Sequence, residues 1–533
     1  MLCTYKEYDI GIGVEDDPIM FSQAMGGNES TLWYNAMKDE MNSMANNQVW
    51  DLVELPKCAK VIGCKWVFKT KRDSSGNIER YKARLVAKGF TQQKGIDYHD
   101  TFSPVSKNDS FRIIMALVAH FDMELHQMDV KTTFLNGDLE EEVYMKQLER
   151  FITNGNDHIV CKLKKSIYGL KQASRQWYLK FHDVISSFGF IENVMDQCIY
   201  HKVSGSKIIF LVLYLDDILL ASNDLGLLHE VKRFLSQQFD MKDMGEASYV
   251  IGIKIERDRS QWILGLSQET YINKVLERFR MKDCSPGTAP IVKSEKFSLN
   301  QCPSNDLEKK EMKNIPYAST VGSLMYAQVC TRPDISYAIG MLGRYQSNPG
   351  LEHWKAAKKV MRYLKGTRDY KLTYRKSTSG YVFLLAGGVI SWRSAKQTLV
   401  ATSTTEAKFV SCFEATSQAI WMRSFISGLQ VVDSISKLVG IYCDNSVVVF
   451  LAKNNKSGSR SKHIDIKYLA IREHVKSNKV AIEHISTRLM ITNPLTKGLP
   501  PKAYKEHVEH MVSILFCKFH VIETPFVFYR IFG

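Results

Sequence analysis

The chain has 533 residues, of which 45% are hydrophobic and 24% are charged. This length and composition exclude a single small binding module, a disordered polar chain and a long coiled coil. Lysine and arginine number 71 against 56 acidic residues, and the resulting net charge of +15 favours a polyanionic partner such as nucleic acid.

The first residues and the most apolar segment both bear on location. The N-terminal letters MLCTYKEY lack the basic and then apolar order of a signal peptide. The run at 208–220 is about 13 residues long and contains Asp216 and Asp217, so it is too short and too charged to cross a bilayer. We therefore expect an intracellular protein, cytoplasmic or nuclear, that is neither secreted nor embedded in a membrane.

Helix and hairpin signals alternate in the first part of the chain. A helix is predicted from Ser30, because serine caps helices and apolar residues follow at three- and four-residue steps. A hairpin is predicted over 61–70 and 78–87. Residues 65–95 contain nine Lys or Arg and two Asp or Glu, nearly half of the excess charge of the chain. This basic surface indicates phosphate binding, with a solvated face as the alternative.

Later segments continue this mixed pattern. Helices are predicted over 111–120 and 174–188, and extended segments over 124–130 and 207–221. Residues 285–316, rich in Ser, Pro, Asn and charge, are predicted to form a linker, and a largely helical region follows from 317 to about 367.

Three aspartates stand out among these elements. Asp216 and Asp217 interrupt an apolar hairpin at its turn, which is costly without a counter-ion. A bare turn is one interpretation, since turns favour aspartate. Asp129 also lies near the end of an apolar strand, far enough along the chain from Asp216 to leave room for two helices and a return strand. Three converging carboxylates would hold two metal ions, as in nucleotidyl transfer.

The order of the motifs resembles the reverse transcriptase part of the Pol polyprotein of copia-type LTR retrotransposons. The segments that carry the resemblance are CKWVFK at 64–69, YKARLVAKGF at 81–90, TFSPV at 101–105, HQMDVKT at 126–132, YGLKQ at 168–172, YLDD at 214–217 and TRPDI at 331–335. It extends from about residue 17 to about residue 500. The resemblance implies an α+β chain with a right-hand polymerase fold of fingers, palm and thumb, then a helical connection and a truncated ribonuclease H-like α/β domain.

The resemblance also implies a domain layout. We expect an N-terminal extension at 1–29, fingers and palm at 30–235, a thumb-like region at 236–284, a linker at 285–316, a helical connection at 317–370, a degenerate ribonuclease H-like domain at 371–500 and an unassigned tail at 501–533.

Roles for individual residues follow from the same resemblance. Asp129, Asp216 and Asp217 match the catalytic, metal-binding carboxylates of the palm, which would hold two Mg²⁺ ions, with Mn²⁺ as a substitute. Lys82 and Arg84, on the basic hairpin, would bind the incoming triphosphate or the template phosphates.

Two further residues are implied to lie near the nucleotide. Phe134 stands five residues beyond Asp129, where an aromatic ring under the sugar would collide with a 2′-hydroxyl and so favour deoxynucleotides. Ordinary core burial of Phe134 is the alternative. Gln172 matches a family glutamine near the nucleotide, and a polar residue before a helix is the alternative.

The ribonuclease H-like part departs from the family pattern. Glu406 and Asp444 match two of its carboxylates, but LTYR at 372–375 runs directly into KSTSGYVF, so the first strand and its aspartate are missing. Asn493 stands where the family has aspartate. A site that keeps two of four carboxylates would hold Mg²⁺ poorly, so we expect this activity to be lost.

Taken together, these features predict an RNA-directed DNA polymerase. Its partners would be an RNA template, a DNA primer or RNA/DNA hybrid, and dNTPs. The alternative is a non-catalytic nucleic-acid-binding relic of the same polyprotein. The sequence indicates neither the primer nor the oligomeric state.

Overall fold

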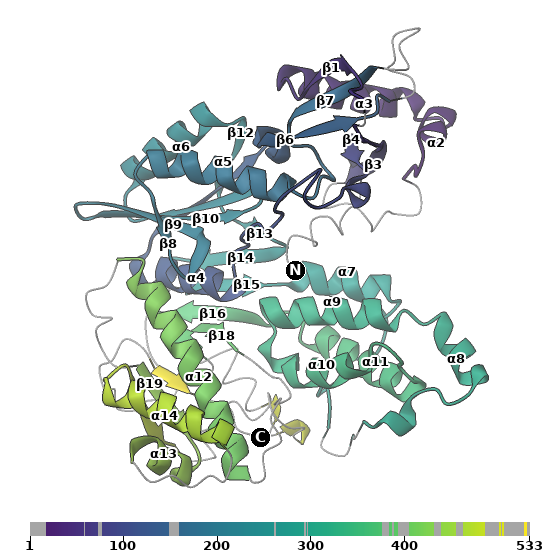
Figure 1. The fold of residues 1–533 in the computed structure, drawn as a ribbon. Coiled ribbons are helices and arrows are strands. Elements are labelled where there is room, and N and C mark those ends of the chain that lie inside the picture. The colour runs from purple at the N-terminus through teal and green to yellow at the C-terminus, as the bar shows by residue number, and fades with distance from the viewer. Residues whose placement is uncertain are drawn as a thin grey trace.

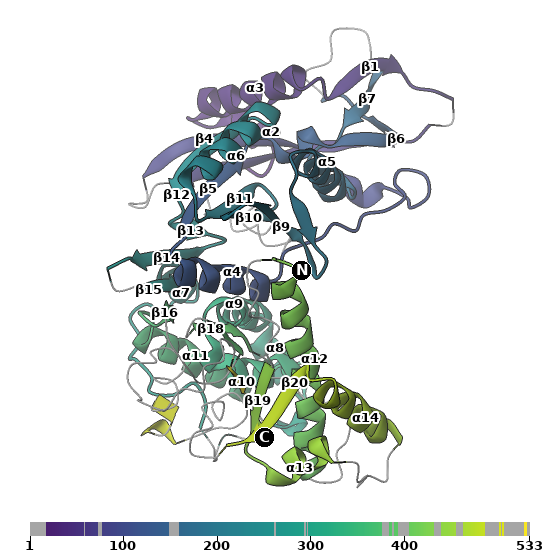
Figure 2. The ribbon, with the colours of Figure 1, turned by 90° about the vertical axis from the view of Figure 1, so that its left-hand side faces the viewer.

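The computed structural model describes residues 17–57, 59–72, 77–148, 159–260, 263–292, 295, 297–375, 383–385, 388–392, 404–430, 439–454, 462–485, 500–502, 504–505 and 527–529. These residues form a mixed α+β structure that contains six sheets. Figure 1 shows an upper lobe, a central sheet with helices on both faces, and two lower regions that contain α7 to α11 and α12 to α14. Figure 2 shows the same division from the side.

The upper lobe combines helices with two small sheets. It contains α2 (Phe21–Gly26), α3 (Ser30–Asn46), the hairpin of β3 (Cys64–Arg72) and β4 (Ile78–Ala87), and a sheet of β1 (Trp50–Glu54), β7 (Ile159–Lys165), β6 (Asp138–Met145) and β2 (Val61–Ile62). The predicted helix from Ser30 and the pairing within the predicted hairpin are confirmed. Residues 61 and 62 instead pair with β6.

The central sheet is antiparallel and is buried on both faces. Its strand order is β12 (Met241–Glu246), β5 (Glu124–Val130), β11 (Asp217–Ser222), β10 (Lys207–Tyr214), β9 (Asp196–Ser204) and β8 (Ile191–Asn193). Helices α5 (Ala173–Ser187) and α6 (Leu225–Gln238) cover one face, and α4 (Asn108–Phe121) covers the other. In β10, Leu211 and Leu213 pack into one core while Phe210 and Val212 pack into the other. Two-sided burial explains the continuous apolar run in the sequence.

A second sheet and a group of helices lie below the central sheet in Figure 1. The sheet has the order β13 (Tyr249–Val250), β14 (Ile253–Asp258), β15 (Ile263–Ser267) and β16 (Lys371–Arg375), and the helices are α7 (Glu269–Arg278), α8 (Asp306–Lys313), α9 (Tyr317–Cys330), α10 (Ser336–Leu342) and α11 (Leu351–Gly366). Short 3₁₀ helices are η1 (Gly89–Thr91), η2 (Thr133–Asn136), η3 (Leu299–Gln301), η4 (Pro333–Ile335) and η5 (Gly343–Tyr345).

Two segments near expected domain boundaries contact other parts of the chain. Where a linker was expected, Ala289 and Ile291 are buried, and the Gly287 amide donates to the Arg362 carbonyl of α11. Apolar residues between the polar ones anchor this segment. Strand β16, at the expected start of the ribonuclease H-like domain, pairs with β15, so no break between sheets falls at residue 371.

The C-terminal region contains β17 (Phe383–Leu385), β18 (Gly388–Ser391), α12 (Thr404–Ser427), β19 (Val439–Cys443), α13 (Ser446–Lys453), α14 (Lys462–Lys476), β20 (Val480–His484) and β21 (Val527–Tyr529). Strand β19 pairs in parallel with β20 on one side and with β21 on the other. Strand β19 therefore has a partner on each side, one of them from beyond residue 500.

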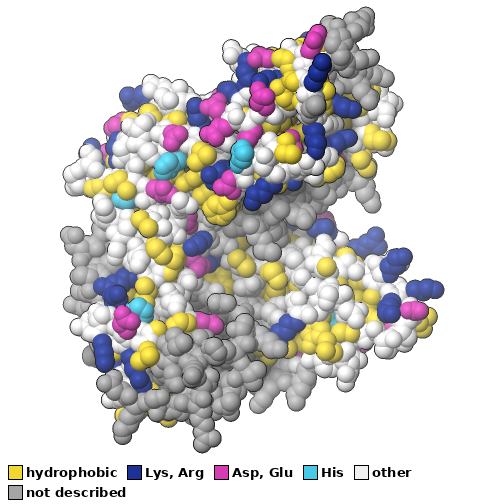
Figure 3. Space-filling model, in the orientation of Figure 1, with side chains coloured by type: hydrophobic (Ala, Val, Ile, Leu, Met, Phe, Trp, Pro, Cys, Tyr) yellow, Lys and Arg dark blue, Asp and Glu magenta, His cyan; other side chains and the backbone are white. Residues whose placement is uncertain are grey.

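The space-filling view shows a hollow between the upper lobe and the region of α7 to α9, with Lys and Arg side chains on both sides (Figure 3). In the described part of the chain, no helix combines the length and the apolar character that a membrane crossing needs.

Candidate active site

The turn between β10 and β11 places two aspartates beside the end of β5. Tyr214 pairs with Asp217 across the hairpin, and Asp217 in turn pairs with Asp129 on β5. The backbone amide of Val130 donates a 2.8 Å hydrogen bond to the carbonyl of Asp216. The three aspartates singled out in the sequence therefore meet at one place in the central sheet.

The same turn contains a strained residue. Leu215 has φ of 56°, in the left-handed region that costs a residue with a side chain about 1–2 kcal/mol. The indole Nε1 of Trp177 donates a 2.7 Å hydrogen bond to the Leu215 carbonyl and holds this conformation. Strain of this kind, maintained by its surroundings, is typical of functional sites.

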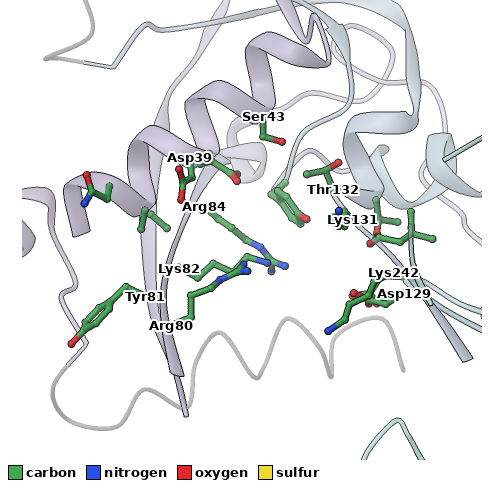
Figure 4. A pocket seen from close by; sticks show the side chains of 18 of the residues that line it. Asp39, Ser43, Arg80, Tyr81, Lys82, Arg84, Asp129, Lys131, Thr132 and Lys242 are labelled. Carbon is green, nitrogen blue, oxygen red and sulfur yellow. Dashed lines mark hydrogen bonds between the residues drawn. The ribbon is translucent and has the colours of Figure 1, made fainter. Parts of the chain in front are cut away.

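A cavity of about 700 Å³ opens between the upper lobe and the end of β5. Its wall is formed by α3, by β4, by the segment from Asp129 to Thr133, and by Tyr168, Asp216 and Lys242. Figure 4 shows Arg80, Lys82 and Arg84 extending from β4 toward the side of the cavity where Asp129 and Lys242 lie. The cavity thus brings the three β4 cations opposite Asp129, and its wall also contains Asp39 and Glu40 of α3 as well as Lys131, Lys242 and Asp216.

The three cations face the cavity because strand residues alternate between faces. Arg80, Lys82 and Arg84 occupy alternate positions of β4 and all line the cavity. Burial, together with the nearby Arg84 and Arg80, lowers the pKa of Lys82 to about 8. The Nε of Arg84 is buried and has no hydrogen-bond partner within the described residues. These cations would gain from an anionic ligand with several oxygens.

Behind the strand, α3 contributes a buried carboxyl group. Glu40 is 8% exposed, and its Oε1 accepts a 3.3 Å hydrogen bond from the backbone amide of Leu85. Burial raises the pKa of Glu40, an effect that the Leu85 hydrogen bond and the charges of Arg84 and Lys82 oppose. Glu40 therefore ties α3 to β4 close to the cations.

The carboxylates divide into two that line the cavity and one that does not. Asp129 and Asp216 are wall residues, whereas Asp217 is 8% exposed and its Oδ1 accepts a 3.1 Å hydrogen bond from Nε2 of Gln127. No group of three or more His, Cys, Asp or Glu side chains in the described ranges is arranged to hold a metal ion. Two cavity carboxylates still fit Mg²⁺, which proteins commonly hold with one or two carboxylates plus substrate phosphates.

The two residues expected near the sugar do not line the cavity. Phe134, in η2, is 7% exposed, and its ring contacts Tyr168 edge to face with centroids 5.0 Å apart. Gln172 is fully buried: its Nε2 donates to the Asp97 carbonyl at 2.9 Å, and its Oε1 accepts from Nε2 of Gln92 at 3.1 Å. Their roles at a nucleotide remain predictions.

Sequence reasoning missed Tyr168, Glu40 and Lys242. Tyr168 belongs to a motif that we used only for its glutamine, and Lys242 is the β12 residue that pairs with Asp129. A signal existed for Tyr168, because Gly169 directly after it marks a turn that reorients the side chains on either side. No local pattern distinguished Glu40 from the other polar residues of its helix.

The ribonuclease H-like residues are described only in part. Asp444 follows directly after β19 and is partly exposed, and position 406 lies on α12. Asn493 and the segment 376–382 lie outside the described residues. The structure therefore does not test the predicted loss of this site.

Comparisons with known proteins agree with the motifs. A family model described as reverse transcriptase (RNA-dependent DNA polymerase) matches residues 47–293. The chain is 44% identical, over 93% of its length, to the retrovirus-related Pol polyprotein from transposon TNT 1-94 of Nicotiana tabacum, and 37% identical, over 93%, to that from transposon RE1 of Arabidopsis thaliana. It covers 39% and 34% of these two proteins. It is also 30% identical to the putative transposon Ty5-1 protein of Saccharomyces cerevisiae, over 54% of this chain and 98% of that protein.

Proposed function

Because the chain belongs to the copia-type retrotransposon Pol family and carries its reverse transcriptase region, we propose that it is an RNA-directed DNA polymerase. It would add deoxynucleotides to a primer 3′-hydroxyl on an RNA template. The observation that carries this proposal is that Asp129 and Asp216 line the same cavity as Lys82 and Arg84. Nucleotidyl transfer uses cations that bind the triphosphate together with carboxylates that hold metal ions at the same phosphates.

Each charged group has a distinct task in this proposal. Lys82 and Arg84 bind the triphosphate and keep it oriented along β4. Asp129 and Asp216 hold divalent metal ions, which this family generally uses, and Asp217 supports them from within the sheet. When bound, two Mg²⁺ ions supply a lowered pKa for the primer hydroxyl and charge neutralisation for the departing pyrophosphate.

The surrounding architecture supports binding of a template and primer. The hollow between the upper lobe and the region of α7 to α9 carries basic side chains on both sides (Figure 3), as a polyanion requires. In this proposal the upper lobe corresponds to the fingers, the central sheet to the palm, and the segment around α7 to the thumb-like region. The ribonuclease H-like part is inactive, because Asn493 and the missing first strand remove two of its carboxylates.

Primer extension on an RNA template tests the proposal. The purified chain is incubated with a labelled DNA primer, dNTPs and Mg²⁺, and binding of the same template and primer is measured by gel shift. We expect extension by the parent chain, and loss of extension with unchanged binding for Asp129→Asn and for Asp216→Asn.

A matched control is Asp183→Asn, which makes the same chemical change at an exposed position of α5. It should extend like the parent. If the parent binds the template and primer but extends nothing, the chain is a non-catalytic nucleic-acid-binding relic and the proposal fails. A rate of primer extension by Asp216→Asn within about tenfold of the parent rate would show that Asp216 is not a metal-binding catalytic residue.

A further inference from the structure

Helix α4, which covers one face of the central sheet, has a second neighbour in the C-terminal region. Strand β18 and helix α12 of that region both contact α4, and Figures 1 and 2 show one end of α12 beside it. Buried residues of β18 and α12 belong to the same hydrophobic core as those of α4 and of the sheet face that α4 covers. The C-terminal region is therefore packed into this core.

The Asp109 carboxylate on α4 accepts two hydrogen bonds from the C-terminal region. Oγ of Ser391, on β18, donates to Oδ2 of Asp109 at 2.7 Å, and Nε2 of Gln418, on α12, donates to the same oxygen at 2.9 Å. The other oxygen of Asp109 pairs with Arg112, one turn further along α4. Hydrogen bonds to a charged acceptor are roughly twice as strong as neutral ones. These two donors therefore fasten β18 and α12 to α4.

Arg112 joins α4 to two further segments. Its side chain is buried; Nε donates a 2.6 Å hydrogen bond to the Ile390 carbonyl of β18, and Nη1 donates a 2.7 Å hydrogen bond to the Val329 carbonyl of α9. The Trp392 ring centroid lies 4.0 Å from the guanidinium carbon. Because a buried charge is costly unless it is hydrogen-bonded, β18 helps α4 to accommodate this arginine.

Helix α12 also contacts an edge strand of the central sheet. Nδ2 of Asn193, on β8, donates a buried 2.8 Å hydrogen bond to the Phe425 carbonyl of α12. Nζ of Lys107, just before α4, lies 4.5 Å from the centroid of the Trp421 ring. The C-terminal region thus contacts both the sheet and the helix that covers it.

From α4 the contacts continue to the turn that contains the aspartates. Phe111 stands on α4 between the two charged residues described above, and its ring contacts that of Tyr214 edge to face, with centroids 6.0 Å apart. Tyr214 is the last residue of β10 and pairs with Asp217 across the hairpin. Close-packed interiors transmit strain between such neighbours. The helix that the C-terminal region fastens is therefore one on which this hairpin packs.

We propose that the C-terminal region serves as a structural part of the polymerase. Through Ser391 and Gln418 it holds α4, and through α4 it stabilises the turn between β10 and β11. The role needs no nuclease chemistry, so it is retained where that chemistry is lost. This inference goes beyond the proposed function, because it concerns the stability of the turn and not the reaction.

Hydrogen exchange of the full chain tests this coupling. Combining Ser391→Ala with Gln418→Leu removes both donors to Asp109 and changes no residue of the cavity wall. Amide exchange should accelerate by about tenfold or more in α4 and in the β10–β11 hairpin as well as in α12, because segments of one cooperative unit open together. Ser417→Ala, at the neighbouring exposed position of α12, should leave all these rates unaltered.

A second variant tests whether any damage to the C-terminal region has the same effect. Asn445 caps α13 by accepting hydrogen bonds from the amides of Val447 and Val448. Asn445→Ala should accelerate exchange in α13 but not in α4. Acceleration that stays within the C-terminal region in the double variant would overturn the proposal, as would an equal acceleration of α4 by Asn445→Ala. Gln418→Leu alone serves if the double variant does not fold.

The exchange measurement needs neither template nor nucleotide, so it separates this inference from the proposed activity. A parent chain whose α4 and C-terminal region exchange as one unit, but which extends no primer, would contradict only the polymerase activity. Where the parent extends a primer, the double variant should lose extension at a lower temperature than the parent, and Ser417→Ala at the same temperature. Unaltered exchange in α4 together with an unaltered inactivation temperature overturns the proposal.

Discussion

The side-chain amide of Gln127 donates a 3.1 Å hydrogen bond from its Nε2 to Oδ1 of Asp217 on the neighbouring strand. Gln127 and Asp129 stand two residues apart on β5 and therefore share a face of the strand. The amide consequently fixes the orientation of a nearly buried carboxylate next to the two that line the cavity. Gln127 does not itself form part of the cavity wall.

Replacing Gln127 by Leu should lower kcat by about tenfold. Substituting a residue that hydrogen-bonds to a metal-binding group typically lowers metal affinity or activity by about ten- to a hundredfold. The KM for dNTP should change little, since Gln127 makes no wall contact with the nucleotide cavity. Steady-state primer extension measures both constants. Gln238→Leu, at an exposed position at the end of α6, is the control. A rise in KM with constant kcat would show that Gln127 affects binding instead.

Nucleotide binding should depend on pH through Lys82. The pKa of Lys82 is lowered to about 8 in the free protein, so the ammonium group is charged at pH 7 and loses its proton as the pH rises past 8. A bound triphosphate favours the charged form, so the KM for dNTP should rise by up to about tenfold per pH unit above 8. Measurement between pH 7 and 9.5 tests this. Lys82→Arg, which stays charged, should remove the dependence, and a parallel rise in that variant would contradict the assignment.

A buried ion pair stabilises the lower helical region. Arg332 and Asp334 are both fully buried, and Nη2 of Arg332 lies 2.6 Å from Oδ2 of Asp334. Asp334→Asn would leave the guanidinium without its counter-charge and should destabilise this region by about 3–5 kcal/mol. Urea unfolding of the full chain measures the change. Asp306→Asn, in an exposed pair with Lys309, should leave the urea midpoint unaltered. An equal loss of unfolding free energy in Asp334→Asn and Asp306→Asn would contradict the prediction that only the buried pair matters.

Restoring one carboxylate should not restore ribonuclease H activity. The change Asn493→Asp leaves the first strand and its aspartate absent, so cleavage of an RNA/DNA hybrid should remain undetectable. Release of labelled RNA from the hybrid is the measurement, and primer extension by the same preparation shows that the protein is folded. Hybrid cleavage by the unmodified chain that disappears in Glu406→Gln would prove the domain active.

Three strands of the central sheet, β5, β10 and β11, could be predicted because their signals are local, whereas β8, β9 and β12 were not predicted. The strand at Glu124–Val130 is confirmed at both ends, and the hairpin around Asp216 is confirmed in its pairing. Long apolar runs bounded by turn residues define such strands without knowledge of the rest of the chain. The sequence predicted that Asp129 would lie near Asp216 and Asp217 because all three stand at the ends of apolar segments, and Asp217 does pair with Asp129.

Contacts between distant segments could not be predicted in this way. Strand β16 completes a sheet with β15, although a long stretch of helices separates them in sequence. Within one motif, Tyr168 lines the cavity while Gln172 is buried against Gln92 and Asp97. Motif spacing shows that Tyr168 and Gln172 are close in sequence. Which of the two reaches the cavity depends on the left-handed turn at Gly169 and on the contacts of Gln172 with distant residues.

Strand β21 gives β19 a second partner from the end of the chain. Its three residues pair in parallel with β19 on the side opposite β20 and contact β17. They are Val527, Phe528 and Tyr529, from a tail outside the family pattern, and none of them is acidic. These three residues therefore satisfy backbone hydrogen bonds of β19 without contributing a carboxylate. Backbone hydrogen bonding can be completed by any peptide that adopts an extended conformation, whereas a metal site needs particular side chains, so a strand from elsewhere in the chain can complete the sheet without completing a site.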